Sequence, residues 1–223
     1  MIKKFDEFIN ENIVGIIDKQ SKGGIVRKEN YVEQVDLGLP SGTIWAACNL
    51  GAESPEEYGD YYAWGETKPN SGYYTGDYKF RAKNKLTKYN KEDGKTILDP
   101  EDDAAHVLLG GKWHIPTKKQ IEELVENTTN EHSELNGVKG KLFTSKINNN
   151  TLFFPYSGYK SGGDIIGKGK LTYCLSSSLY EHSSNYEHSS NYSNGLFSNS
   201  DESKFDISIR CNGLPVRGVL DKK

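Results

Sequence analysis

The sequence predicts an α+β domain in which many short strands outnumber a few helices. Residues 35–65 place three aromatic-rich β segments between turns dense in Gly and Pro, a pattern typical of short strands. Residues 138–156 form a second run of strand-like segments, followed by closely spaced glycines. Helical periodicity is confined to a few segments, so the balance of elements favours the α+β class.

The strands are predicted in order along the chain. Residues 43–47 form a short apolar strand after the turn at 36–42, and residues 58–64 pack aromatic rings around small side chains. Residues 69–90 are interpreted as a long loop with short strands. Strands then follow at 138–147 and 151–156, joined by a turn of three asparagines. The aromatic residues interpreted as core packing are Tyr61, Tyr62, Trp64, Trp113, Phe153 and Phe154.

One helix is predicted to begin near residue 99. Asp99 suits the N-cap and Pro100 the first helical position, and acidic residues in the first turn complement the helix dipole. The carboxylates Asp99, Glu101, Asp102 and Asp103 could instead ligate calcium. Because an acidic first turn explains them without a cation, no metal site is predicted.

The best helix in the chain is predicted to begin after Pro116. Thr117 and Gln120 form a capping box, and Ile121 and Leu124 begin the buried stripe. The helix is predicted to end at residues 127–129.

An amphipathic helix is predicted at residues 1–20, followed by a flexible linker at 21–32 and the main domain at 33–221. The apolar stripe of this helix could pack on the main domain or dock the protein onto a neighbouring subunit or another copy of itself. The predicted docking residues are Phe5, Phe8, Ile9, Ile13, Ile16 and Ile17.

Composition excludes several classes of function. The chain has 223 residues, a net charge of −3 and interspersed Lys and Asp/Glu, so no basic face for nucleic acid is expected. Three widely spaced cysteines fit neither a disulfide framework nor a CxxC metal site and are interpreted as small buried residues. No secretory signal and no membrane span are predicted.

Eight segments, in order, carry a resemblance to a known family. They are VDLGLPSGTIWAACNLGA, YGDYYAWGE, LDPEDDAAH, GGKWHIPTKKQIEEL, NGVKGKLFTSK, LFFPYSGYKSG, YCLSSS and GLPVRGV. Together they span about residues 33–220, and the chain resembles the major paralogous domain proteins abundant in Bacteroidetes and Fibrobacteres. That family resembles the formylglycine-generating-enzyme branch of the C-type-lectin fold.

The resemblance implies a C-type-lectin-like domain of short twisted antiparallel strands, two helices and long loops that display a ligand-binding face. Formylglycine-generating oxidases require a close pair of copper-binding cysteines, whereas Cys174 and Cys211 lie far apart in this chain. The Glu-Pro-Asn, Gln-Pro-Asp and Trp-Asn-Asp triplets of calcium-dependent lectins do not occur. Oxidase chemistry and calcium-dependent sugar binding are therefore not carried over, and no cofactor is predicted.

Residues 176–203 hold 11 Ser, 4 Asn and 3 Tyr among 28 positions and contain a perfect six-residue duplication, YEHSSN-YEHSSN. Tyr, Ser and Asn dominate antibody loops because Tyr gives large contact area at low entropic cost and small polar residues adapt their hydrogen bonds. The segment also resembles the variable region of lectin-fold proteins diversified by retroelements. The predicted ligand-binding residues are Tyr180, Asn185, Tyr186, Asn191, Tyr192 and Asn194.

Two other interpretations of this segment remain open. It could be a slipped repeat in a solvated low-complexity loop. His182 and His188 could bind zinc, although further ligands are not identified. Ser176–Ser178 beside Cys174 suggest a nucleophile, but no base accompanies them, and the motifs of hydrolases, nucleotide-binding proteins and metalloproteases are missing.

We therefore expect a non-enzymatic binding or adhesion module. Its most concrete form is a bacteriophage virion protein that recognises a host-surface glycan or protein, because the start KKFDEFINEN is similar to the openings of phage structural proteins. The alternative is a structural head or tail decoration protein docked through residues 1–20. A cytoplasmic location, or a bacterial cell surface reached without a signal peptide, is the alternative to the virion.

Overall fold

The computed structural model describes residues 32–180 and 191–222. They belong to one compact unit, which begins at Val32. The predicted N-terminal helix and most of the linker lie outside the described residues.

The predicted α+β, C-type-lectin-like class is wrong: the described part is mostly β. Strands account for 40% of it and helices for only 12%, and the strands are divided among several small sheets. One reason lies at Thr128–Leu135, where a largely polar segment after a helix forms an eight-residue strand. Gly, Pro and Asn turns also keep most of the other strands short, so they form separate sheets rather than one large sheet beside helices.

Three sheets have three strands each, and all their strand pairs are antiparallel. They comprise β1 (Gln34–Asp36), β2 (Ile44–Ala46) and β15 (Val219–Leu220); β6 (Thr128–Leu135), β7 (Val138–Ser145) and β8 (Thr151–Pro155); and β11 (Leu171–Leu179), β12 (Tyr192–Asn199) and β13 (Ser203–Ile209). In the third sheet β12 is central and β13 is an outer strand.

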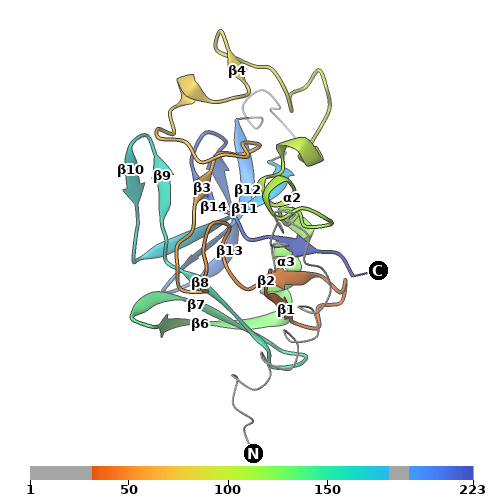
Figure 1. Ribbon diagram of the computed structural model, residues 1–223, viewed down its shortest axis with the longest axis vertical. Helices are drawn as coiled ribbons and strands as arrows, with labels where there is room; N and C mark the ends of the chain where they lie inside the picture. The colour runs from red at the N-terminus through yellow and green to blue at the C-terminus, as the bar shows by residue number, and fades with distance from the viewer. Residues whose placement is uncertain (1–31, 181–190, 223) are drawn as a thin grey trace, which may run out of the picture. The chain divides into compact units, whose positions relative to one another are not determined.

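Three two-stranded ribbons complete the β structure. They are β3 (Tyr61–Tyr62) with β14 (Leu214–Pro215), β4 (Arg81–Ala82) with β5 (Lys85–Leu86), and β9 (Tyr159–Ser161) with β10 (Asp164–Ile166). The β4–β5 hairpin lies at the top of Figure 1, and the β6–β7–β8 sheet lies at the bottom.

Helix α3 (Lys118–Asn127) covers part of one face of the β11–β12–β13 sheet. Its buried residues Ile121 and Leu124 join Trp45, Phe143 and Leu196 in a hydrophobic core between the sheets. The predicted capping box is confirmed: the Thr117 hydroxyl accepts the N–H of Gln120, and the Gln120 side chain accepts the N–H of Thr117.

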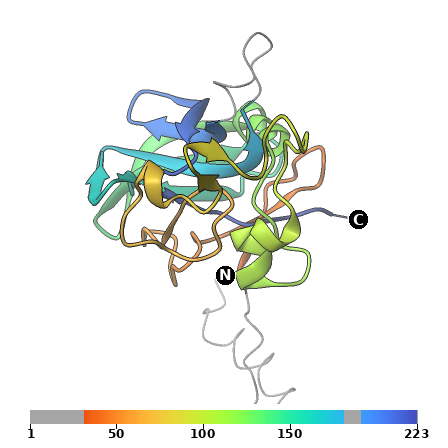
Figure 2. The same ribbon diagram turned by 90° about the horizontal axis from the view of Figure 1, so that it is seen from above.

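The helix predicted from residue 99 is divided in two. A 3-10 turn (Pro100–Asp102) comes first, and α2 (Ala104–Leu109) follows it. Asp103, rather than Asp99, caps α2, because its Oδ1 accepts the N–H of His106 over 2.9 Å. In Figure 2 the yellow-green α2 and the blue turn between β12 and β13 lie on opposite sides of this unit.

A second core is rich in aromatic rings. Trp64, Tyr78 and Tyr89 pack there, and the guanidinium of Arg210 lies over the Trp64 ring at 4.5 Å from its centroid. The six aromatic residues predicted to be core are all buried, which confirms that prediction. Cys174 and Cys211 are also buried, whereas Cys48 is partly exposed. Among the described residues, the structure contains no helix with the length and apolarity needed to span a bilayer.

Candidate ligand-binding site

The Tyr/Ser/Asn-rich segment is held between two strands of one sheet. β11 leads into it and β12 leads out of it. The two strands pair from Leu171 with Asn199 to Leu175 with Gly195 and, after a shift in register, at Leu179 with Ser193. Both strands are largely buried. The segment therefore starts and ends on a rigid part of the structure.

Three hydrogen bonds fix the ends of the segment. The N–H of Tyr180 donates to the carbonyl of Tyr192 over 3.2 Å, which closes the two ends onto one another. The N–H of Arg210 donates to the carbonyl of Asn191 over 3.0 Å. Nη2 of Arg81 donates to Oδ1 of Asn191 over 2.6 Å, so the β4–β5 hairpin is joined to the same point.

Arg210 supports this point from the protein interior. It is 1% exposed, and burial lowers the pKa of its guanidinium, an effect that nearby Tyr78 partly offsets. Nε donates to the Tyr78 hydroxyl, Nη1 to the carbonyl of Tyr89 and Nη2 to the carbonyl of Lys88. The guanidinium thereby connects the loop after β5 to the strand end that holds Asn191.

The structure describes some of the predicted ligand-binding residues and not others. Tyr180, Asn191 and Tyr192 lie together at the closed ends of the segment and are partly exposed. Asn185 and Tyr186 lie outside the described residues, as do His182 and His188.

Asn194 requires a correction. It is 3% exposed, and its Nδ2 donates to the carbonyl of Leu179 over 2.8 Å. Its amide thus links β12 to β11 and presents almost no surface to a ligand, because position 194 falls under the covered part of the sheet.

Three exposed isoleucines lie on the sheet face that carries Tyr192. Cross-strand partners share a face, and Tyr192 is opposite Ile209 while Asn194 is opposite Ile207. Leu179 and its partner Ser193 lie on the opposite face of the sheet, so Ser178, which precedes Leu179, lies on the Tyr192 face. Ile97 is bridged to Ser178 and therefore lies on the Tyr192 face as well. Ile97, Ile207 and Ile209 are 52%, 36% and 43% exposed.

The sequence analysis did not identify these isoleucines or Arg81. Ile207 and Ile209 alternate with polar residues in β13, and that period of two is a signal of a half-buried strand. Arg81 carries no such signal, since its contact with Asn191 joins residues 110 positions apart.

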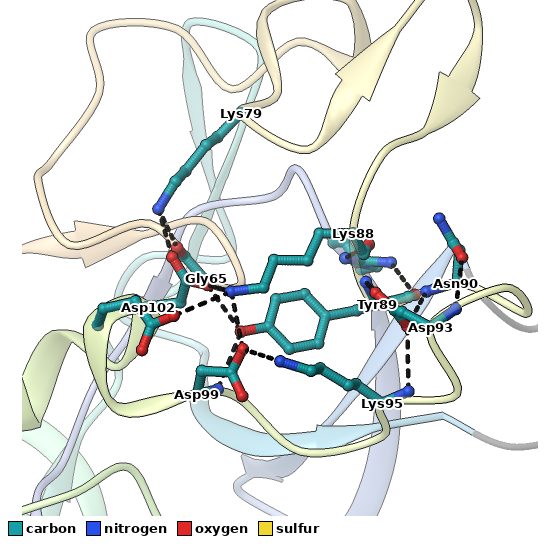
Figure 3. A network of polar contacts seen from close by, with 11 residues as sticks. Gly65, Lys79, Lys88, Tyr89, Asn90, Asp93, Lys95, Asp99 and Asp102 are labelled. Carbon is teal, nitrogen blue, oxygen red and sulfur yellow. Dashed lines mark hydrogen bonds and ion pairs between the residues drawn. The ribbon is translucent and has the colours of Figure 1, made fainter.

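Three of the four acidic residues considered for calcium hold lysines instead, and Figure 3 shows two of them, Asp99 and Asp102. Asp99, Glu101 and Asp102 are close enough together to share a cation. Nζ of Lys88 lies 2.8 Å from Asp99, 3.3 Å from Glu101 and 2.5 Å from Asp102. An ammonium group therefore occupies the centre of this carboxylate cluster.

Two more lysines and a tyrosine complete the cluster. Lys79 pairs with Asp102 and Lys95 with Asp99, each over 2.6 Å, and the Tyr89 hydroxyl donates to Asp102 over 2.7 Å. Hydrogen bonds from Lys88 and then Lys95 lower the pKa of Asp99 to about 2. Burial acts to raise the pKa of Asp102, but hydrogen bonds from Lys79, Lys88 and Tyr89 lower it overall. The cluster is a neutralised structural network.

The serines beside Cys174 are positioned for packing. Ser176 and Ser177 are 0% and 3% exposed, and the carbonyl of Ser176 accepts the indole N–H of Trp64 over 2.9 Å. Burial raises the pKa of the Cys174 thiol to about 11, so it stays protonated at neutral pH. These groups are not arranged as a nucleophile with a base.

A small hollow lies beside the closed ends of the segment and has room for about one water molecule. It is lined by Thr75, Tyr78, Arg81, Leu86, Asn191, Ile209, Arg210 and Cys211. A ligand at this place would therefore bind to the outer surface rather than enter a cavity.

No family model, curated protein or solved structure matches this chain. The resemblance to the major paralogous domain proteins stays a prediction from the sequence. The six predicted docking residues in the first 20 positions lie outside the described residues. The structure therefore does not test the alternative of a decoration protein docked through residues 1–20.

Proposed function

We propose that this protein is a non-catalytic binding module of a bacteriophage virion that recognises a glycan or protein on the host surface. The observation that carries the proposal is the backbone hydrogen bond between Tyr180 and Tyr192. It brings both ends of the Tyr/Ser/Asn-rich segment to one point, beside the exposed isoleucines of the same sheet.

The side chains at this point suit surface recognition. Tyr180 and Tyr192 are partly exposed, and a tyrosine offers an apolar ring and a hydroxyl with few rotatable bonds. Ile97, Ile207 and Ile209 add apolar area next to them. Exposed apolar surface rimmed by polar residues is typical of a protein interaction site.

The framework beneath the site suits the same role. Binding is weakened by the entropy lost when a flexible site is ordered, and a rigid base reduces that loss. Here the ends of the segment are fixed by Arg81 and Arg210, and the latter is itself buried among aromatic rings. The segment can therefore change in sequence without altering the residues that hold its ends.

The experiment compares the full-length protein with Y180S/Y192S on intact bacterial cells and on an array of bacterial surface polysaccharides. We expect the double variant to lose binding by at least about tenfold, because tyrosines are enriched among the residues that dominate binding energy and a combined loss of about 1.4 kcal/mol is tenfold. The melting temperature should fall by only a few degrees, because the Tyr180–Tyr192 bond is made by backbone atoms.

The matched control is Y58S/Y74S, which removes the partly exposed Tyr58 and the exposed Tyr74 from positions outside this sheet. Its binding should equal that of the unaltered protein. Equal binding by Y180S/Y192S would remove the site assignment, and hydrolysis of a polysaccharide by the unaltered protein would remove the non-catalytic role.

A further inference from the structure

A strongly basic segment lies within this acidic protein. Residues 79–95 contain seven Lys and Arg and only two Asp and Glu, whereas the whole chain has a net charge of −3. The expectation of no basic face was based on the whole-chain balance, which conceals this local excess. The segment includes the β4–β5 hairpin and the loop that follows it.

Four of the seven cations have partners within the protein. Lys79, Lys88 and Lys95 pair with the carboxylates of Asp99, Glu101 and Asp102. Arg81 donates to Asn191 and to the carbonyl of Asn84. These four groups serve the fold.

The other three cations are Lys83, Lys85 and Lys91, and all three are exposed. Within residues 32–180 and 191–222, no ion pair includes any of them. Lys83 and Asn84 have φ values of 48° and 61°, as expected for a tight two-residue hairpin turn. Lys83 and Lys85 are therefore displayed by a short, well-defined turn rather than by a long loop.

The hairpin lies next to the proposed binding site. The 2.6 Å hydrogen bond from Arg81 to Asn191 joins β4 to the residue before Tyr192. In Figure 1 the hairpin extends from the end of the unit farthest from the β6–β7–β8 sheet. Arg210 joins the carbonyls of Lys88 and Tyr89 to Asn191, so the loop that holds Lys91 is anchored at the same point. A polymer that extends from Tyr192 along the hairpin and this loop would meet the three lysines.

We infer that Lys83, Lys85 and Lys91, together with Tyr180 and Tyr192, form a binding surface for an acidic polysaccharide. The inference rests on the proposed function and specifies its ligand class. Unpaired exposed lysines attract carboxylate or phosphate groups, and a flexible point charge tolerates variation in their position. Tyrosine rings supply flat apolar area for sugar rings.

The test measures binding of the full-length protein to immobilised polygalacturonate, with neutral dextran and single-stranded DNA as comparison probes. We expect binding to polygalacturonate to weaken steeply with added salt. K83Q/K85Q/K91Q should bind at least about tenfold more weakly at low salt, since each substitution removes a positive charge that attracts the polyanion.

The matched control is K112Q/K139Q/K170Q, which removes three exposed lysines elsewhere and changes the net charge equally. Its affinity should stay within about twofold of the unaltered protein. An equal loss in both triple variants would show a general charge effect and overturn the inference.

Tighter binding to single-stranded DNA, or binding to dextran alone, would also overturn it. Neither result would affect the role of Tyr180 and Tyr192, which the cell-binding experiment tests separately. If Y180S/Y192S bound cells normally while K83Q/K85Q/K91Q lost polygalacturonate, the assignment of the site to Tyr180 and Tyr192 would fail and the lysine surface would remain.

Discussion

Nε of Arg217 donates a hydrogen bond to Oδ1 of Asn49 over 2.9 Å, with both side chains buried. Its two other nitrogens donate to the carbonyls of Ala46, Ala47 and Phe153, and the guanidinium lies over the Phe154 ring. Burial lowers the pKa of Arg217 to about 10. The Arg217 side chain thereby connects residues that are far apart in sequence. None of the described ion pairs includes Arg217.

Replacement of Arg217 by methionine should reduce the free energy of unfolding by at least about 3 kcal/mol. R217M keeps much of the apolar volume but leaves several buried acceptors without donors, and each unsatisfied group costs about 1 to 3 kcal/mol. Urea denaturation followed by tryptophan fluorescence measures the loss. K139M, at an exposed position, is the control and should change stability by less than about 0.5 kcal/mol. A loss below about 1 kcal/mol for R217M would contradict the prediction.

Replacement of Lys88 by methionine should destabilise the protein at neutral pH by about 1 to 2 kcal/mol, a value that allows for solvent screening of the partly exposed ammonium. The pKa of Asp99 is about 2 in the folded protein, against about 4 when unfolded. Because the folded pKa is depressed, the stabilisation is complete above about pH 4 and is lost as the pH falls towards about 2.

The difference between K88M and the unaltered protein should therefore narrow as urea denaturation is repeated from about pH 7 down to about pH 3. K91M is the control, because Lys91 is exposed and has no described ion pair. A difference that stays constant with pH would show that Lys88 acts through packing alone.

Replacement of Thr117 by alanine should cost about 1 kcal/mol, the usual value for loss of an N-cap side chain. The backbone N–H of Gln120 would lose its acceptor, the Thr117 hydroxyl, at the start of α3, the helix that covers part of the β11–β12–β13 sheet. The exposed Thr87 provides the control variant T87A. Thermal denaturation of both variants measures the effect, and equal melting temperatures would argue against the cap.

Replacement of residues 181–190 by a Gly/Ser linker of equal length should leave the free energy of unfolding within about 1 kcal/mol. The bonds that close the segment belong to Tyr180, Asn191 and Tyr192, which the variant retains. N191A is the contrasting variant, since it leaves Arg81 without its side-chain acceptor and should be less stable than the linker variant. The opposite order of stabilities would contradict the assigned anchor.

Local patterns in the sequence predicted local structure well. The capping box of Thr117 and Gln120, the strands on either side of the three asparagines and the buried aromatic residues all depend on neighbouring positions. Such features follow from short-range preferences that a single sequence contains.

Features that depend on distant residues were missed or misassigned. β6 has a polar sequence and forms because each of its residues pairs with β7. Asp99 resembles an N-cap, but its carboxylate binds Lys88 and Lys95. Asn194 resembles its neighbours in the Tyr/Ser/Asn-rich segment, and only the pairing of β11 with β12 shows that it is buried. The sequence could therefore predict the composition of the candidate site, but it could not show which residues hold that site in place.

The outer strand β13 also limits how copies of this protein can associate. Oδ1 of Asp206 accepts the N–H of Ile207 over 2.8 Å, and Lys204 lies two positions away on the same strand. A backbone amide occupied by a neighbouring carboxylate cannot recruit a foreign strand, and charged side chains disfavour such addition further. Copies of this protein at high local concentration can thus expose the isoleucines of β13 while strand addition at that edge is disfavoured.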